Sequence, residues 1–305
     1  MVGRVATFSR NEQMLAATLR TQTRMAELQM QEATGLVATD YGGLGAGAKR
    51  TIDLQVSVAR AESYVDTTNL AKGRVEVMYS VMGTLTDLLT DLRSQITAAS
   101  GATTGTGQNL KAAAQELLED FASMLNTRYE GRYLFAGGRT DTEPVDISGA
   151  SYPPATSPST PSTSYYRGDG QIASVRVSDT QVVAYGVTAD DPAFEQALRS
   201  LSLVANIATD PLDPDTLDEA SDLLLDALDS VLAVQSRLSL DAGSMEDAVA
   251  NQEDYIEFAR SLVSDLTEVD VAEVAARLSS YQAQLEASYA SLAKIQNLNL
   301  WDYLR

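Results

Sequence analysis

The chain has 305 residues, 44% of them hydrophobic and only 6% aromatic, and its 22 basic and 42 acidic side chains give a formal net charge of −20. Because it contains no Cys and no His, thiol nucleophiles, Ser/His/Asp triads, histidine acid/base catalysis, ordinary zinc sites and disulfide bonds are excluded. We therefore expect neither an enzyme nor a cofactor or metal site, and a chain of this length can bury the cores of two or three domains.

The first part of the chain is predicted to be helical. Residues 5–34 are compatible with a helix that has few apolar side chains to bury, so this helix would be marginal alone. Thr34 and Gly35 end it, and residues 35–48 are expected to form a flexible, glycine-rich connection. A helix of about fifty residues then runs from near Lys49 to Ser100, and a further helix is expected over 108–130.

The middle of the chain changes to a composition rich in Pro, Ser and Thr. Five prolines between residues 144 and 164 predict an exposed loop, from which 153–163 could be deleted with little effect. Alternating apolar residues over 172–177 and again over 182–185 predict two short paired strands.

Helical signals return in the rest of the chain. Asp191-Pro192 and Asp213-Pro214 each place an aspartate at the N-cap and a proline at the first helical position. The first helix should end near Ala208, and the second should end before Asp241-Ala242-Gly243. A last long helical run is expected to reach about Asn297, with an interruption between 265 and 270.

Two of the long helical segments have apolar residues at alternating spacings of three and four. One series is Met78, Met82, Leu85, Leu89, Leu92, Ile96 and Ala99, and the other is Val271, Val274, Leu278, Tyr281, Leu285, Ser288, Leu292 and Ile295. Because such a seam must be buried against another helix, we predict that these two seams pack on each other. The predicted fold is mainly α, a long antiparallel helical bundle or coiled coil formed by the N- and C-terminal segments, with a small β-rich insertion at its tip.

The negative charge is concentrated in residues 206–275, which hold eighteen Asp and Glu against two Arg, a net of −16. Residues 1–32 hold four Arg and three Glu, a net of +1. The acidic block indicates a solvated helix face, or a device that keeps an assembly-prone protein soluble. No basic stripe could neutralise phosphates, so we expect no nucleic-acid partner.

Sorting signals are absent from the sequence. The residues after Met1 form no apolar run of signal-peptide length, and nothing approaches the roughly 18 to 20 apolar residues of a membrane span. We expect no membrane partner, and either a cytosolic protein or one exported without a cleaved signal.

Several short motifs do not support a binding site. The run from Gly42 to Thr51 resembles a phosphate-binding loop, but Ala48 separates the glycine from the lysine and no strand precedes it. Asp210, Asp213, Asp215 and Asp218 lack the glycine and the terminal Glu of a calcium loop, and helix capping explains them. The Arg167-Gly168-Asp169 tripeptide is expected to be a tight turn. Carboxylates four residues apart, such as Asp87 and Asp91, are read as solvated helix faces.

Three segments resemble the flagellin superfamily and, within it, the hook-associated proteins at the junction of hook and filament. They are residues 125–137 (LNTRYEGRYLFAG), 166–170 (YRGDG) and 292–304 (LAKIQNLNLWDYL). Thr34-Gly35-Leu36 also matches the wider superfamily. Two features depart from the pattern: Asp40–Gly45 replaces an acidic stretch ending in proline, and Arg305 resembles the ending of filament flagellins. Filament flagellin is therefore the alternative.

The resemblance implies a structural role, in which terminal arms order on assembly into a ring or helical polymer. It implies contacts with neighbouring axial proteins and flagellin, export through the flagellar type III apparatus, and a cytosolic chaperone for the C-terminal arm. The expected division is 1–48 as N-terminal arm, 49–138 and 209–270 as bundle halves, 139–208 as outward-facing insertion, and 271–305 as C-terminal arm. The expected assembly residues are Met14, Leu15, Leu19, Met25, Leu28, Leu278, Tyr281, Leu285, Leu292, Ile295, Leu298, Leu300, Trp301, Tyr303 and Leu304.

Two other classes of protein are compatible with long helical seams. A non-flagellar coiled-coil adaptor would explain the heptads but not the β-rich insertion and the matching end segments. An enzyme on a helical bundle would need polar side chains converging in a cavity, and the sequence offers no such set.

Overall fold

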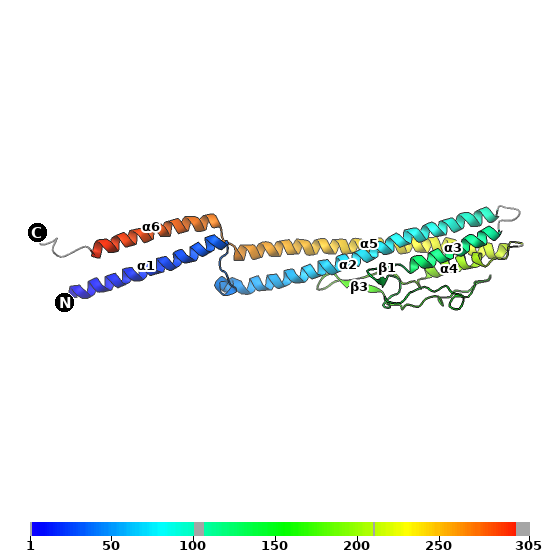
Figure 1. The fold of residues 1–305 in the computed structure, drawn as a ribbon, viewed down its shortest axis with the longest axis horizontal. Coiled ribbons are helices and arrows are strands. Elements are labelled where there is room, and N and C mark those ends of the chain that lie inside the picture. Colours follow the sequence, from blue (N-terminus) through cyan, green and yellow to red (C-terminus); the bar gives the residue numbers. More distant parts are fainter. Residues whose placement is uncertain (1, 101–106, 210, 297–305) are drawn as a thin grey trace. The chain divides into compact units, whose positions relative to one another are not determined.

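The chain is mainly helical (Figure 1), as expected. The computed structural model describes residues 2–100, 107–209 and 211–296. The helices are α1 (Val2–Thr34), the 3-10 helix η1 (Tyr41–Gly47), α2 (Ala48–Ser100), α3 (Gly107–Leu125), α4 (Pro192–Ala205), α5 (Pro214–Thr267) and α6 (Val271–Gln296). Among the described helices, none combines the length and apolar character needed to cross a bilayer.

Two short antiparallel hairpins accompany the helices. Strand β1 (Arg128–Tyr129) pairs with β2 (Arg132–Tyr133), and β3 (Ala173–Arg176) pairs with β4 (Val182–Tyr185). The second hairpin confirms the paired strands predicted from the apolar alternation. The chain divides into two compact units, residues 1–60 with 255–305 and residues 61–254.

The larger unit has one continuous apolar core. All seven members of the seam from Met78 to Ala99 are buried on α2, and Leu85, Leu89 and Leu92 have no exposed surface. They belong to the same core cluster as α3 and α4 and the apolar seam of α5 from Leu217 to Leu238. The predicted pairing of this seam with the one at 271–295 is therefore wrong. The seam of α5 has the same spacing and supplies the apolar surface that α2 requires.

Helix α5 continues without a break through Asp241-Ala242-Gly243, where the sequence predicted an end. Met245 and Ala248, just beyond the glycine, lie in the same core as Leu238. A glycine inside a helix costs about 1 kcal/mol relative to alanine, and the burial of a methionine outweighs that cost. The interruption predicted between 265 and 270 is present, and Asp270 Oδ1 caps α6 by accepting from the Ala272 N–H at 2.9 Å.

Helix α3 ends at Leu125, five residues before the predicted end at 130. Asn126 turns the chain, because its side chain exchanges two 2.9 Å hydrogen bonds with the backbone of Val145. The β1–β2 hairpin follows, and its turn residues Glu130 and Gly131 have φ of 50° and 77°. This hairpin was not predicted from the sequence. The pattern that could have predicted it is the Arg-Tyr pair on each side of Glu130-Gly131.

The first two segments of the family resemblance meet in the larger unit. Phe135 and Ala136 of the 125–137 segment are fully buried, and Phe135 packs edge to face on Phe194 of α4, with 6.1 Å between ring centroids. Asp169 of the 166–170 segment accepts from the Gly138 N–H at 2.7 Å and donates its own N–H to the Ala136 carbonyl at 3.2 Å. The hydrogen bond from Gly138 lowers the pKa of Asp169.

The Arg167-Gly168-Asp169 tripeptide is held by these contacts, in agreement with a structural turn. Arg167 pairs with Asp146 and donates to Ser151 Oγ at 3.0 Å. A backbone hydrogen bond from Ser148, together with the Ser151 hydroxyl, lowers the pKa of Asp146 to about 2. Both charged side chains of the tripeptide therefore have partners inside the fold.

The proline-rich loop is better anchored than its composition predicted. The Ser159 N–H donates to Glu219 Oε1 of α5 at 2.8 Å, and the Ser162 N–H donates to Glu195 Oε1 of α4 at 3.0 Å. Glu195 is 5% exposed and pairs with Arg199 at 3.0 Å. Hydrogen bonds from Ser157 and Ser159 also lower the pKa of Glu219. Deleting 153–163 would remove these hydrogen bonds and leave Glu195 with Arg199, so the contacts argue against the tolerance that the composition predicted.

Leu89→Asp tests the core of the larger unit. The substitution buries an unpaired charge in place of a leucine with no exposed surface, so we expect the free energy of unfolding to fall by several kcal/mol. Chemical denaturation of the purified chain measures the change. The matched control is Thr90→Asp at the next, exposed position of α2, which should unfold much as the parent does. Equal effects of the two substitutions would contradict this core.

Gly137→Ala tests the contact between the two family segments. Gly137 has φ of 67°, and an added Cβ would overlap the Asp169 carbonyl oxygen. Gly131 has φ of 77° with open space around it, so Gly131→Ala isolates the backbone strain, about 1 to 2 kcal/mol. We expect Gly137→Ala to lower the melting temperature clearly more than Gly131→Ala. Similar losses would mean that the carbonyl of Asp169 moves aside.

Candidate assembly interface

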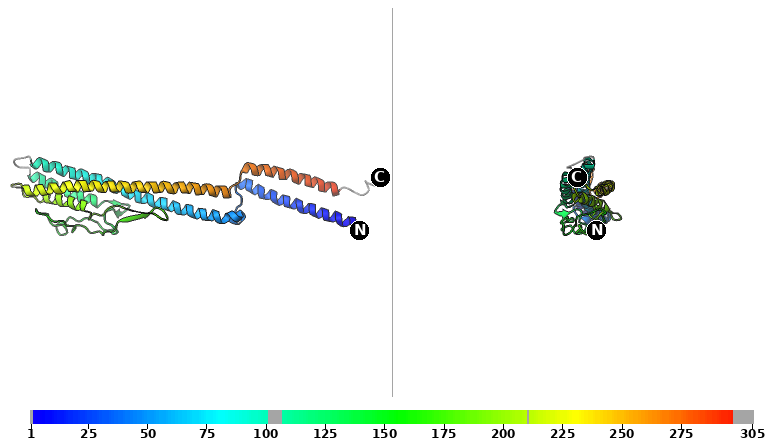
Figure 2. Two further views of the ribbon diagram at one scale, coloured as in Figure 1. Left: turned by 180° about the vertical axis from the view of Figure 1, so that it is seen from behind. Right: turned by 90° about the vertical axis from the view of Figure 1, so that its right-hand side faces the viewer.

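The terminal helices α1 and α6 lie side by side (Figures 1 and 2). Leu28 of α1 clusters with Val274 and Leu278 near the start of α6, and Gln22 Nε2 donates to the hydroxyl of Tyr289, further along α6. The helices are therefore antiparallel. This pairing supplies the partner of the 271–295 seam, which is α1 rather than α2.

The inner face of α1 repeats every three or four residues. Thr18 and Leu28 are buried, at 5% and 9% exposed, and Thr21 and Met25 between them are half-buried. Leu28 and Met25 were expected assembly residues, whereas Thr18 and Thr21 were missed because they are polar. Thr18 Oγ1 donates to the Met14 carbonyl at 2.9 Å, which satisfies its hydroxyl inside its own helix. The spacing 18, 21, 25, 28 was the signal that could have found them.

The predicted seam of α6 is present, but most of its side chains are only half-buried. Val274 and Leu278 are 5% and 8% exposed, and Tyr281, Leu285 and Leu292 are half-buried. Leu278, Tyr281, Leu285 and Leu292 therefore all face α1 or its edge, as expected of one helix face. Within the described side chains, three buried apolar residues form a small core for helices of 33 and 26 residues.

A second apolar face of α1 is exposed to solvent. Leu15 is 55% exposed, Leu19 is 54% exposed and Met30 is 56% exposed, and all three lie on one side of the helix. Met14, at 38% exposed, is not on this face: it continues the inner spacing 14, 18, 21 and lines a groove between α1 and α6. Because the inner face already contacts α6, Leu15 and Leu19 remain available to another molecule.

Polar contacts add little to the pairing of α1 and α6. A groove of about 320 Å³ separates parts of the two helices and is lined by Met14, Ala17, Thr18, Gln284, Ala287, Ser288, Ser291 and Leu292. The ion pairs Arg24–Glu27 and Arg277–Glu273 lie within single helices and are more than half exposed. Exposed pairs of this kind contribute about 0.5 kcal/mol or less. The arms of this chain are therefore paired but weakly packed.

Backbone hydrogen bonds join the two helix breaks beside this pair. The Val37 N–H donates to the Thr267 carbonyl at 2.8 Å, and the Val269 N–H donates to the Gly35 carbonyl at 2.9 Å. Leu36 and Glu268 form the antiparallel bridge between them. Gly35 has φ of 72°, which ends α1 and turns the chain into this bridge.

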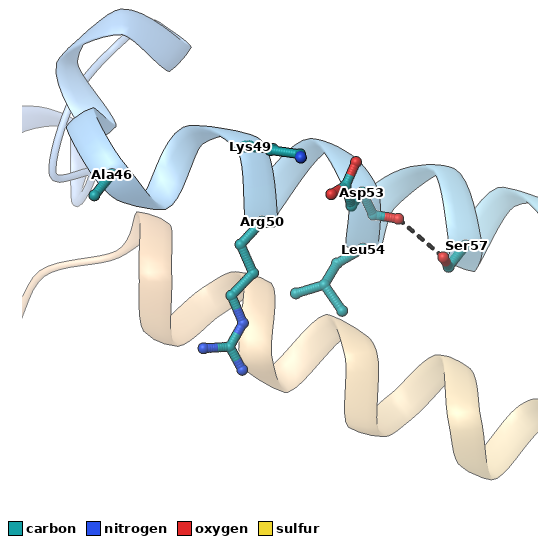
Figure 3. Close-up of a pocket in the computed structure, with 6 residues that line it drawn as sticks. All are labelled: Ala46, Lys49, Arg50, Asp53, Leu54 and Ser57. Carbon is teal, nitrogen blue, oxygen red and sulfur yellow. Dashed lines mark hydrogen bonds between the residues drawn. The ribbon is translucent and has the colours of Figure 1, made fainter.

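The glycine-rich run before α2, predicted to be a connection, forms the 3-10 helix η1. Asp40 caps η1 by accepting from the Gly43 N–H at 2.8 Å, and the run leads directly into α2. No strand precedes it in the described chain, so it is not a phosphate-binding loop. A shallow groove of about 350 Å³ lies at this helix start (Figure 3), lined by Ala46, Lys49, Arg50, Asp53, Leu54 and Ser57. We call it the basic groove.

Some predicted residues cannot be placed. The side chain of Ile295 and residues Leu298, Leu300, Trp301, Tyr303 and Leu304 lie outside the described residues.

Asp213, from the aspartate cluster, caps α5 by accepting from the Asp215 N–H at 3.3 Å. In the described ranges, no three acidic side chains gather as metal ligands.

Two family models match the chain. The bacterial flagellin N-terminal helical region matches residues 5–140, and the bacterial flagellin C-terminal helical region matches residues 219–304. Together they span most of the chain and include α1 and α6. The insertion between them belongs to neither model.

Relatives and solved structures agree with these models. Flagellar hook-associated protein 3 of Salmonella typhimurium is 22% identical, with 99% of this chain and all of that protein aligned. Flagellar hook-associated protein 3 of Escherichia coli is 24% identical over 95% of this chain and 96% of that protein. A flagellar hook-associated protein of Vibrio parahaemolyticus has a similar fold, with a TM-score of 0.60, 14% identity, and coverage of 75% and 99%. FlgL of Bacillus cereus has a TM-score of 0.56, 15% identity, and coverage of 68% and 99%.

Proposed function

This chain belongs to the flagellin family, and on that premise we propose that it is a structural subunit of the bacterial flagellum at the junction between hook and filament. One observation carries the choice of the junction: two hook-associated proteins align with this chain over nearly the full length of both. Filament flagellin, the alternative, would account for the terminal family models but has no comparable full-length relative among these proteins. The function is thus assembly, and we propose no catalytic activity.

Assembly follows from the uneven packing of the chain. The larger unit buries its own seams, whereas among the side chains that the structure describes α1 and α6 share Leu28, Val274 and Leu278 as their buried apolar residues. Helices with so little buried surface gain stability from neighbouring molecules, so their folding is coupled to binding. Leu15, Leu19 and Met14 are proposed as contacts to neighbouring subunits, together with the inner residues Met25, Leu28, Leu278, Tyr281, Leu285 and Leu292.

The proposed division of the chain assigns one role to each part. Residues 1–48 and 271–305 are the assembly arms, 49–138 and 209–270 are the bundle halves, and 139–208 is the outward-facing insertion. The partners are further copies in a ring or helical polymer, neighbouring axial proteins and flagellin. Ile295, Leu298, Leu300, Trp301, Tyr303 and Leu304 complete the C-terminal arm in this proposal.

Export of the unfolded chain through the flagellar type III apparatus is part of the same proposal. A chain without cysteine acquires no disulfide that would block passage through a narrow channel. A cytosolic chaperone that covers the apolar C-terminal arm before export would prevent premature association.

Hydrogen exchange of the purified full chain tests the coupled folding. Because α1 and α6 share a small core, we expect residues 5–34 and 271–296 to exchange much faster than the Met78–Ala99 seam in the monomer, and to become protected in isolated flagella. The single tryptophan, Trp301, should change its fluorescence on assembly. Strong protection of both arms in the monomer would contradict the mechanism. The Met78–Ala99 seam is the internal control, because it should be protected in both states.

The position of the protein on the flagellum tests the assignment itself. A tagged chain with its insertion labelled should appear as a point at the hook end of isolated flagella. Immunogold electron microscopy measures this directly, with the organism's filament protein labelled in parallel as a control. A signal along the whole shaft would instead support filament flagellin.

A further inference from the structure

The outer face of α5 carries apolar residues that nothing in the described chain covers. Leu225 and Leu232 are each 45% exposed and lie seven residues apart, hence on one side of the helix. Asp218, Asp222 and Asp229 continue the same face at spacings of four and three, and all are exposed. We call these five residues the acidic leucine face. Its spacing matches a helix-packing seam, although the buried seam of α5 lies on the opposite side.

The start of α2 also has an exposed apolar face, and the charged side chains beside it are mainly basic. Ile52 is 42% exposed and Val56 is 53% exposed, and Lys49 lies on the same side as both. The basic groove adjoins this face, and Figure 3 shows Lys49 and Arg50 on it from successive positions of α2. Asp53 leaves the groove a net charge of +1, from two basic side chains and one acidic. Within the described chain, no ion pair is formed by Lys49 or Arg50.

We infer that the acidic leucine face of one copy packs on the basic groove and the Ile52–Val56 face of a second copy. Ile52 and Val56, four residues apart, pack against Leu225 and Leu232, which are seven residues apart, and Asp222 and Asp229 meet Lys49 and Arg50. The complementary charges favour this occupant: a chain of net charge −20 repels its own copies except where a basic surface meets an acidic one. The contact joins two different surfaces, so repetition builds a ring or a helical array. The inference rests on the proposed function.

The contact is weak by itself. A contact made by four half-exposed apolar side chains and two ion pairs falls short of the roughly 1,200 Å² that a stable complex buries. It therefore forms when the arms have already raised the local concentration of copies. This fits a protein that is exported as single chains and associates only at its destination.

The absence of cysteine from the chain allows a clean cross-linking test. The Ile52→Cys and Leu225→Cys variants are expressed together in the source bacterium, and isolated flagella are treated with a mild oxidant. We expect a disulfide-linked dimer containing one chain of each variant, because a disulfide requires Cα atoms within about 7 Å. The matched control replaces Ile52→Cys by Tyr79→Cys, which is 44% exposed on α2 and should give no dimer with Leu225→Cys.

Charge reversal gives an independent readout. Lys49→Glu with Arg50→Glu should lower the amount of the protein in isolated flagella, and adding Asp222→Lys with Asp229→Lys in the same chain should restore it. All four positions are exposed, so the melting temperature of each monomer should match the parent. The inferred contact would be wrong, and the proposed function would stand, if flagella contain the protein at the hook end but show neither the 52–225 dimer nor any change of protein amount on charge reversal. A cross-link from the Ile52→Cys variant to a different protein would also overturn the inference, whereas absence of the parent chain from flagella would overturn the proposed function as well.

Discussion

The fold depends on the burial of one uninterrupted apolar seam along α2. From Met78 to Ala99 every third or fourth residue is buried, and α3 and α5 present matching seams to it. This core lets α5 pass through Gly243 without ending, and it gives the insertion a rigid surface on which to fold. In the part of the terminal helices whose side chains the structure describes, the shared cluster contains three buried apolar residues, a much smaller core. Most of the buried apolar surface that stabilises the fold thus lies in residues 61–254. The terminal arms bury less of it and keep exposed apolar residues that another molecule could contact.

Periodicity in the sequence was sufficient to predict the seams and the mainly α fold, but not the partner of each seam. A heptad pattern states that a helix has an apolar face, and every such face in this chain has the same spacing. Choosing α1 rather than α2 as the partner of α6 depends on Thr18 and Thr21, whose polar side chains hide the inner face of α1 from a hydrophobic pattern. The assembly residues were therefore half predictable: Leu28 and Leu278 are the inner contacts, while Leu15 and Leu19 face outward.

The insertion was the hardest region to predict because its contacts are polar and distant in sequence. Asn126 bonds to Val145, Gly138 to Asp169, and Ser159 to Glu219, so each link joins segments that no local propensity relates. A loop rich in Pro, Ser and Thr resembles a disordered linker by composition, yet its backbone N–H groups satisfy buried or half-buried carboxylates. This network joins segments 125–137 and 166–170, and Gly137 within it has a positive φ.

The bridge between Leu36 and Glu268 sets the phase of the two arms. Counting from that bridge, the direction of the side chain rotates by about 100° with each residue of α1. The same rotation applies to each residue of α6, counted from the other strand of the bridge. Met14 and Leu292 line the same groove only because the number of residues between the bridge and each of them is matched. Inserting one residue in α1 between Leu28 and the bridge would turn the outer leucines of α1 inward and its threonines outward. Substitutions in the arms preserve this phase, so the arms should accept changes of residue far more readily than changes of length.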